Sequence, residues 1–172
     1  MTMDNSSLDN TKHKSPQKPD VAVGAIVLHE DTVLLIKRAT APNKGKWSIP
    51  GGRQELGETT KETLVREVKE ETGLIVTPKD LIDVVDLIQK DENGNLTFHY
   101  TLVDYWAEGD GTKPIIDTTE LEDARWVNIT NLDSYNLWDE TTRVITASVE
   151  KRTQSGKQSA IGHHQTQSQT QQ

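Results

Sequence analysis

Apolar residues recur along the chain with two spacings, one typical of strands and one of helices. Two β-branched runs, Val21 to Glu30 and Asp31 to Ala39, meet at the polar residues 29–31 and predict two strands at the buried centre of a sheet. Later runs at 81–89 and 96–107 flank an Asn-Gly turn, which is a strong hairpin signal. Shorter apolar stretches predict further strands at 47–49, 75–77 and 124–127.

A helical spacing begins near Thr59. Leu64 and Val68 lie four residues apart and form the centre of an apolar stripe. Thr59 and Glu62 have the spacing of a capping box, and Gly73 suits the left-handed position just past a last helical turn. The sequence therefore predicts a helix between Thr59 and Gly73.

A second helical pattern lies between 131 and 151. Its apolar members are Leu137, Trp138, Val144, Ile145 and Val149. We expect a closing helix that begins near Asn136, with Trp138 as a packing residue.

The two ends of the chain differ in amino-acid composition from the middle. Residues 1–19 are polar and contain two prolines, and we expect a disordered leader in which His13 is incidental. Residues 153–172 are low in complexity and rich in Gln, Ser and Thr, which predicts a disordered tail where His163 and His164 make a poor metal site. One folded domain is expected at 20–152, since 172 residues with 33% hydrophobic content suit a single core.

Composition narrows the class of protein. The chain contains no cysteine and therefore neither a disulfide framework nor a thiolate metal site. Its net charge is −8, and an acidic domain repels duplex nucleic acid. No apolar run approaches the roughly 18–20 residues that span a bilayer, and no signal peptide is apparent. We expect a cytoplasmic protein with neither a nucleic-acid nor a membrane partner.

Three carboxylates share one side of the first helix. At about 100° per residue, Glu67, Glu70 and Glu71 fall within an arc of about 100° that borders the apolar stripe. Glu67 and Glu71 form a like-charge i,i+4 pair that costs an isolated helix about 0.2–0.5 kcal/mol. Immediately upstream, Gly51 and Gly52 follow a proline and predict a tight turn whose backbone can approach a ligand closely. A divalent cation at this turn would remove the repulsion between the acids.

The same stretch matches a longer motif. The pattern G-x5-E-x7-R-E-U-x-E-E-x-G-U, with U aliphatic, is met by Gly52, Glu58, Arg66, Glu67, Val68, Glu70, Glu71, Gly73 and Leu74. A solvated, Glu-rich helix face is the alternative, but it gives no reason for the two glycines and the arginine at fixed offsets. The chain thus strongly resembles the Nudix hydrolases. The resemblance implies an α/β fold, namely a Nudix-type α/β/α sandwich with a mixed β-sheet. It also implies hydrolysis of a nucleoside diphosphate derivative with Mg²⁺ or Mn²⁺.

By this resemblance, Glu67 and Glu71 are the main metal ligands. Glu70 is a further or water-mediated ligand, and the Gly51 carbonyl completes the set. Arg66 and Glu58 would orient the carboxylates rather than bind metal. The proton of the attacking water goes either to a glutamate of the motif or to Glu120, for which Glu122 and Asp123 are competitors.

Substrate contacts are expected from outside the motif. Arg38, at the end of a strand, and Arg53, just past the glycines, are candidates to neutralise phosphate. Trp47, His99 and Tyr100 are candidates for stacking on a base or binding a sugar, whereas Phe98 and Tyr105 are expected to cover the sheet.

Three functions remain open at this stage. The segments 98–108 and 122–126 look like the small bacterial ADP-ribose pyrophosphatase-like branch, whose products would be AMP and ribose 5-phosphate. The second is a (d)NTP or oxidised-NTP pyrophosphatase that releases a nucleoside monophosphate and pyrophosphate. The third is a non-catalytic nucleotide-sensing domain, against which the intact set of acids argues. Because members of the family commonly dimerise, a homodimer is expected.

Overall fold

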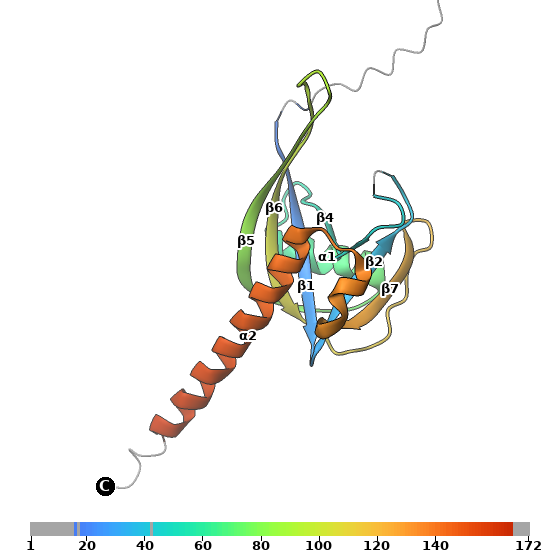
Figure 1. Cartoon of the computed structure of the whole chain (residues 1–172). Helices are drawn as coiled ribbons and strands as arrows, with labels where there is room; N and C mark the ends of the chain where they lie inside the picture. Colours follow the sequence, from blue (N-terminus) through green and yellow to red (C-terminus); the bar gives the residue numbers. More distant parts are fainter. Residues whose placement is uncertain (1–15, 17, 42, 167–172) are drawn as a thin grey trace, which may run out of the picture.

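A computed structural model describes residues 16, 18–41 and 43–166, with side chains to residue 157 (Figure 1). The predicted leader, apart from residues 16, 18 and 19, and the end of the predicted tail, 167–172, lie outside the described residues. The strands are β1 (Asp20–His29), β2 (Thr32–Arg38), β3 (Trp47–Ser48), β4 (Gly51–Arg53), β5 (Thr77–Lys90), β6 (Leu96–Glu108) and β7 (Leu121–Asn128). The helices are α1 (Thr60–Thr72), the 3₁₀ helix η1 (Ile129–Tyr135) and α2 (Asp139–Thr166).

The strands form one mixed sheet in the order β3-β2-β1-β6-β5, with β4 paired to β1 and β7 paired to β2. β1 runs parallel to β6, and the other pairs are antiparallel. The expected hairpin is confirmed as β5 and β6, which project beyond the body of the molecule (Figure 1). The separate strand expected at 75–77 is wrong: a single long β5 begins at Thr77, and register shifts near Leu81 mark the irregularity.

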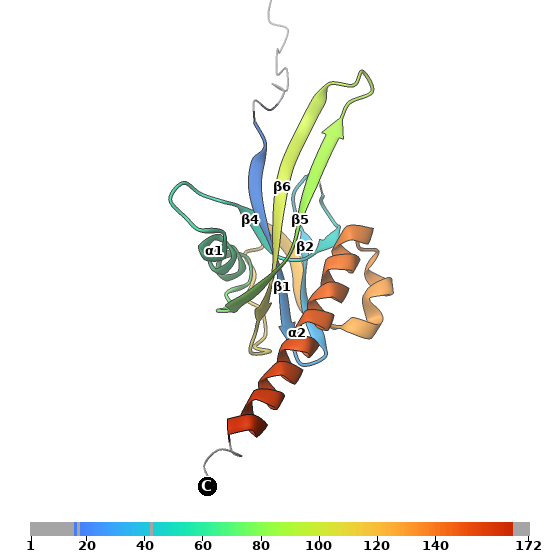
Figure 2. The same cartoon turned by 90° about the vertical axis from the view of Figure 1, so that its left-hand side faces the viewer.

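Two hydrophobic clusters cover the two faces of the sheet. Ile26 and Leu28 of β1 face α2 and η1, while Ala25 and Val27, which alternate with them, face α1. This alternation follows from the two-residue period of a strand. Figure 2 shows α1 and α2 on opposite sides of the sheet. The fold is therefore the expected α/β/α sandwich, and both apolar faces of β1 are buried as its run of apolar residues predicted.

Helix α1 begins and ends where the sequence indicates. Thr59 and Glu62 form a complete capping box, and Gly73 adopts φ +70° and donates its backbone N–H to Lys69. Leu64 and Val68 are fully buried against the sheet. The stripe they form fixes the rotation of the helix and therefore the direction in which its glutamates point.

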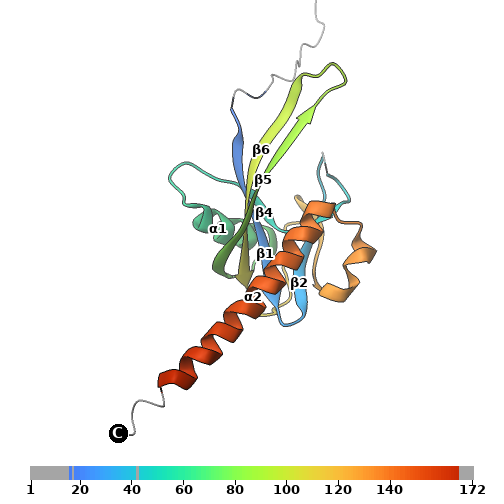
Figure 3. The ribbon, with the colours of Figure 1, turned by 60° about the vertical axis from the view of Figure 1, so that its left-hand side comes forward.

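Helix α2 differs from the expectation at both ends. It begins at Asp139, after η1 and a left-handed Asn136, and it continues to Thr166 through residues expected to be disordered from 153 (Figure 3). Its side chains from 153 to 157 are mostly exposed, so burial does not hold this part in place. The sequence of this part does not favour a helix, since it contains Gly156 and Gly162, which each cost about 1 kcal/mol relative to alanine, but extending an existing helix avoids the cost of nucleation. None of the described helices is both long and apolar enough to cross a bilayer.

Candidate functional site

The site is organised by two glycines in β4. Gly51 has φ +145°, and a Cβ atom there would lie 2.1 Å from the backbone oxygen of Val23 in β1. A Cβ on Gly52 would lie 2.4 Å from the carboxylate of Glu67. Real Cβ atoms do not approach other atoms this closely. At Gly51 the neighbour is backbone, so only glycine fits, whereas a Cβ at Gly52 would displace the Glu67 carboxylate from the bend. The missing side chains let α1 place its acids directly against the β4 backbone.

Glu67 and Glu71 lie at this double-glycine bend. The Gly51 N–H donates a hydrogen bond to Glu71 Oε2 at 2.9 Å, and the Glu71 side chain is only 4% exposed. Burial raises the pKa of Glu71 to about 7 against the opposing effect of that hydrogen bond. Burial also raises the pKa of Glu67, although Arg66 bonds to it. Both carboxyl groups are therefore held where a positive charge would stabilise their ionised form.

Arg66 joins the remaining acids of the motif. It donates to both oxygens of Glu58, at 2.7 and 3.0 Å, to Glu67 Oε1 at 2.8 Å and to Glu70 Oε2 at 3.0 Å. Its hydrogen bonds are the main cause that lowers the pKa of Glu58 to about 2. Glu70 is 59% exposed and borders a second hollow together with Glu58 and Arg66. The structure thus places Glu67 and Glu71 at the bend and Glu70 on an outer rim.

The donors at the bend suit a hard divalent cation. In the described residues, no three acidic or histidine side chains form a ready-made cation cage. Arg66 engages Glu67 and Glu70, while the Gly51 amide engages Glu71. Nevertheless, two carboxylates with raised pKa values touch consecutive glycines, and all the available donors are oxygens. Oxygen donors of this kind are what Mg²⁺ and Mn²⁺ bind in proteins, so the residues fit such an ion.

The structure separates the three acids proposed around the start of β7: Glu120 precedes the strand, and Glu122 and Asp123 lie in it. Glu122 pairs with Lys37 at 2.8 Å, and Asp123 pairs with Arg125. Glu120 is exposed, and its negative charge contributes to the raised pKa of both Glu67 and Glu71. Of the three, Glu120 is therefore the one whose charge acts on the carboxylates at the bend.

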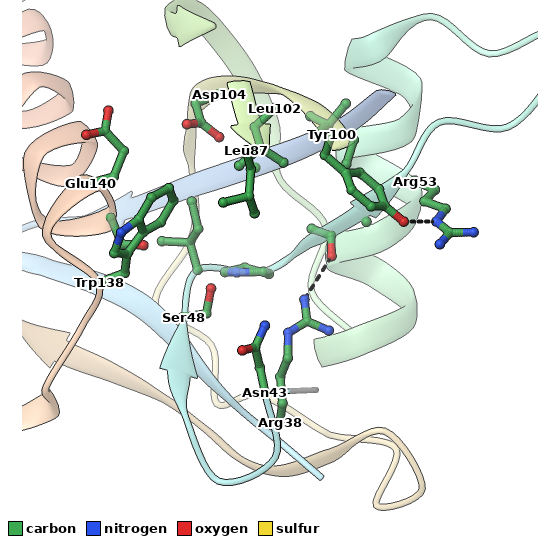
Figure 4. Close-up of a pocket in the computed structure, with 18 of the residues that line it drawn as sticks. Arg38, Asn43, Ser48, Arg53, Leu87, Tyr100, Leu102, Asp104, Trp138 and Glu140 are labelled. Carbon is green, nitrogen blue, oxygen red and sulfur yellow. Dashed lines mark hydrogen bonds between the residues drawn. The ribbon is translucent and has the colours of Figure 1, made fainter. Parts of the chain in front are cut away.

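A cavity of about 380 Å³ opens beside the glycines (Figure 4). Arg38, Arg53 and Tyr100 line it, and Arg38 Nη2 donates to the Gly51 carbonyl at 3.4 Å. The Arg53 guanidinium also bonds to the Tyr100 hydroxyl and lies over its ring. Three of the five residues proposed for substrate binding thus meet at one end of the cavity. This end holds two guanidinium groups, and each has one acid at the limit of an ion pair: Arg38 lies 3.9 Å from Glu71, and Arg53 lies 3.8 Å from Asp20.

The other two proposed residues do not line this cavity. Trp47 packs edge-on against Tyr135, with the Arg125 guanidinium over its ring. His99 lies next to Tyr100 on β6 and therefore on the opposite face of that strand. The structure therefore does not place Trp47 and His99 in contact with a ligand in this cavity.

The sequence reasoning missed several cavity residues. Phe98 lines the cavity next to Tyr100, with the two ring centroids 4.3 Å apart. Asp104, Trp138 and Glu140 line the other end, far from Arg53 in Figure 4. Trp138 was expected to pack inside the protein, but it is 50% exposed. The available signal was the alternation of β6, which places the carboxylate of Asp104 on the same side as Phe98, Tyr100 and Leu102.

Asp104 is expected to make stability depend on pH. Burial raises its pKa from an ordinary 3.8 to about 6, so the folded state keeps a proton that the unfolded state releases. Stability contributed by this group is lost as pH rises from about 4 to about 6. At about 1.4 kcal/mol per pKa unit, the Asp104→Asn variant should be more stable than the parent by up to about 3 kcal/mol at pH 8 and equally stable below pH 4.

Urea unfolding of the metal-free proteins at pH 4, 6 and 8 measures this difference. The exposed residue Asp86 provides the control, since Asp86→Asn should change stability by less than about 0.5 kcal/mol at each pH. A gain for Asp104→Asn that stays constant with pH would contradict the account of a buried, titrating carboxyl.

Comparison with known proteins places the chain in a family. The model of the NUDIX domain matches residues 18–148. An ADP-ribose pyrophosphatase from Methanocaldococcus jannaschii is 43% identical over 88 residues, which cover 51% of this chain and 52% of that protein. An 8-oxo-dGTP diphosphatase from Escherichia coli is 33% identical over 91 residues, covering 52% of this chain and 69% of that protein.

Comparison with solved structures supports the same family. The crystal structure of a MutT NUDIX hydrolase from Burkholderia pseudomallei has a TM-score of 0.66 and 29% identity, over 76% of this chain and 98% of that chain. The present chain spans only about half the length of the Methanocaldococcus relative that it matches. The substrates of such relatives are therefore not assigned to this chain by the match alone.

Proposed function

Because the chain belongs to the Nudix family, we propose that it is a cation-dependent hydrolase that cleaves the diphosphate of a nucleotide derivative. The observation that carries this proposal is the pair of buried carboxyls, Glu67 and Glu71, held against consecutive glycines beside a cavity with a basic end. A solvated acidic helix would have neither the buried acids nor the matching glycines.

Each charged residue at the site has a proposed task. Glu67, Glu71 and the Gly51 carbonyl would hold Mg²⁺ or Mn²⁺, with Glu70 contributing from the outer rim, and divalent ions are in general use in this family. When bound, such a cation polarises phosphoryl oxygens and makes water a stronger nucleophile at neutral pH. Arg66 keeps Glu67 and Glu58 in position through its hydrogen bonds.

Arg38 and Arg53 would neutralise the substrate's phosphates at the basic end of the cavity. Glu120 is proposed to accept the proton of the attacking water, because its charge acts on both carboxyls at the bend. A glutamate of the motif is the alternative acceptor.

For the substrate, we favour ADP-ribose or a related ADP-sugar, cleaved to AMP and a sugar phosphate. The similarity to an ADP-ribose pyrophosphatase, at 43% identity, supports this choice. The second candidate is a (d)NTP or an oxidised NTP, because the chain is also 33% identical to an 8-oxo-dGTP diphosphatase over a similar length.

A nucleotide panel is expected to distinguish the candidates. With Mg²⁺, kcat/KM for ADP-ribose should exceed that for 8-oxo-dGTP and dGTP by at least about tenfold, with AMP and ribose 5-phosphate as products, because pocket contacts typically discriminate by this amount. Excess EDTA should abolish turnover and excess Mg²⁺ restore it. Chromatographic product analysis provides the measurement.

Each other outcome overturns part of the proposal. Faster release of pyrophosphate from the triphosphates would favour the second candidate. No turnover of any substrate with Mg²⁺ or Mn²⁺ would contradict catalysis and favour a domain that only senses nucleotides.

A further inference from the structure

Asp104 is a buried carboxyl without a protein partner. It lies on β6 opposite Gly24 of β1 and is 5% exposed. A Cβ on Gly24 would lie 2.1 Å from Asp104 Oδ1, so the carboxyl rests directly on the β1 backbone at the floor of the cavity. Among the residues that the structure describes, no hydrogen bond or ion pair reaches its oxygens. Asp104 is not among the fully enclosed side-chain groups without a partner, so its oxygens open to the cavity, and the cavity is where a donor can approach.

The nearest cation is committed elsewhere. Arg143 pairs with Asp83, which faces Asp104 across the β5–β6 ladder, and with Glu140. Arg143 therefore acts on Asp104 only through space, while Asp83 and Glu140 add negative charge around it. This end of the cavity accepts hydrogen bonds and repels acceptors, because a carboxylate offers only lone pairs.

The walls beside Asp104 suit a flat ring. Leu87 and Leu102 form apolar surface, and the half-exposed Trp138 stands over the same end (Figure 4). The opposite end holds the cationic Arg38 and Arg53. The cavity as a whole therefore suits a molecule with a flat, hydrogen-donating ring at one end and phosphates at the other.

From this arrangement we propose that Asp104 is a specificity-determining residue that accepts a hydrogen bond from the exocyclic amino group of an adenine. This inference rests on the proposed function and specifies its substrate as a 6-amino purine nucleotide. In the same pose, a 6-oxo purine such as hypoxanthine would place carbonyl lone pairs against the carboxylate, and its N1–H could reach the carboxylate only after the ring shifts. The site therefore selects adenine over hypoxanthine.

Binding of AMP and IMP tests the proposal, because the two differ only in the 6-substituent and in the hydrogen that IMP carries on N1. Calorimetry at pH 8 in EDTA isolates the base from cation-dependent binding. The parent protein should bind AMP about ten- to a hundredfold more tightly than IMP, the range expected for a hydrogen bond to a charged group. In Asp104→Asn the ratio should fall below about threefold, since an amide can donate to the 6-oxo group.

Two further variants serve as a control and as an independent test. Asp86→Asn makes the same chemical change at an exposed site and should keep the parent ratio. Gly24→Ala keeps Asp104 but displaces its carboxyl, and should also lower the ratio. Circular dichroism checks that each variant is folded. An unchanged ratio in folded Asp104→Asn and Gly24→Ala would overturn the proposal.

Turnover of ADP-ribose and of its hypoxanthine analogue tests the role of Asp104 in base selection separately from the proposed hydrolase activity. Hydrolysis of both at equal kcat/KM would overturn the role of Asp104 while leaving the hydrolase intact. A large AMP preference in binding without hydrolysis of either compound would support the base site and contradict the proposed function.

Discussion

Replacement of Glu67 by glutamine is expected to lower kcat for nucleotide hydrolysis by about a hundred- to a thousandfold. The change removes a negative charge that touches Gly52 at the proposed cation site, and losses of two to three orders of magnitude are typical when one group that stabilises the transition state is removed. Steady-state kinetics at saturating Mg²⁺ measures the effect. The same loss is expected for Glu71→Gln.

The fold should survive this change. Burial already raises the pKa of Glu67, so a neutral amide removes an unfavourable charge, and Arg66 keeps its bonds to Glu58 and Glu70. The exposed Glu150 on α2 supplies a matched control, since Glu150→Gln should retain the parent's kcat and midpoint of unfolding. A Glu67→Gln protein with near-parental turnover would refute its assignment as a ligand.

Replacement of Gly51 by alanine is expected to destabilise the protein by about 3–5 kcal/mol and to abolish turnover. The backbone at φ +145° is unfavourable for alanine, and the new methyl group would meet the Val23 carbonyl of β1, which cannot rotate away. The bend that carries the carboxylate contacts would have to move. Urea unfolding gives the stability change.

Gly94 at the tip of the hairpin distinguishes the cost of a positive φ from the cost of the clash with the β1 backbone. It has φ +81° but open space around its Cβ position, so Gly94→Ala should cost only about 1–2 kcal/mol and leave turnover unchanged. Equal costs at the two positions would show that the close approach at Gly51 contributes nothing.

Local signals predicted much of the fold. The capping box at Thr59 and the left-handed Gly73 set the limits of α1, and the Asn-Gly turn set the hairpin. These features depend on neighbouring residues, which sequence patterns report directly. The end of α2 was mispredicted because the sequence argument required burial, whereas an existing helix can continue without paying again for nucleation.

The site was only partly predictable, because its cavity is made by long-range pairing. Helical geometry places three glutamates on one side of α1, but only the packing of β4 against α1 separates Glu67 and Glu71 from the exposed Glu70. Asp104 reaches the cavity because β6 runs parallel to β1, and no local pattern indicates that pairing. Trp138 reads as a packing residue by its period, yet the start of α2 places it at the cavity.

Manganese binding followed by electron paramagnetic resonance tests the central assignment most directly, because it reports the cation without requiring substrate. The parent and Glu150→Gln proteins should bind Mn²⁺ with equal affinity, while Glu67→Gln and Glu71→Gln should each bind at least about tenfold more weakly, the smaller end of the range for a lost charged contact. Parental Mn²⁺ affinity in both Glu67→Gln and Glu71→Gln would contradict a cation site at the double-glycine bend.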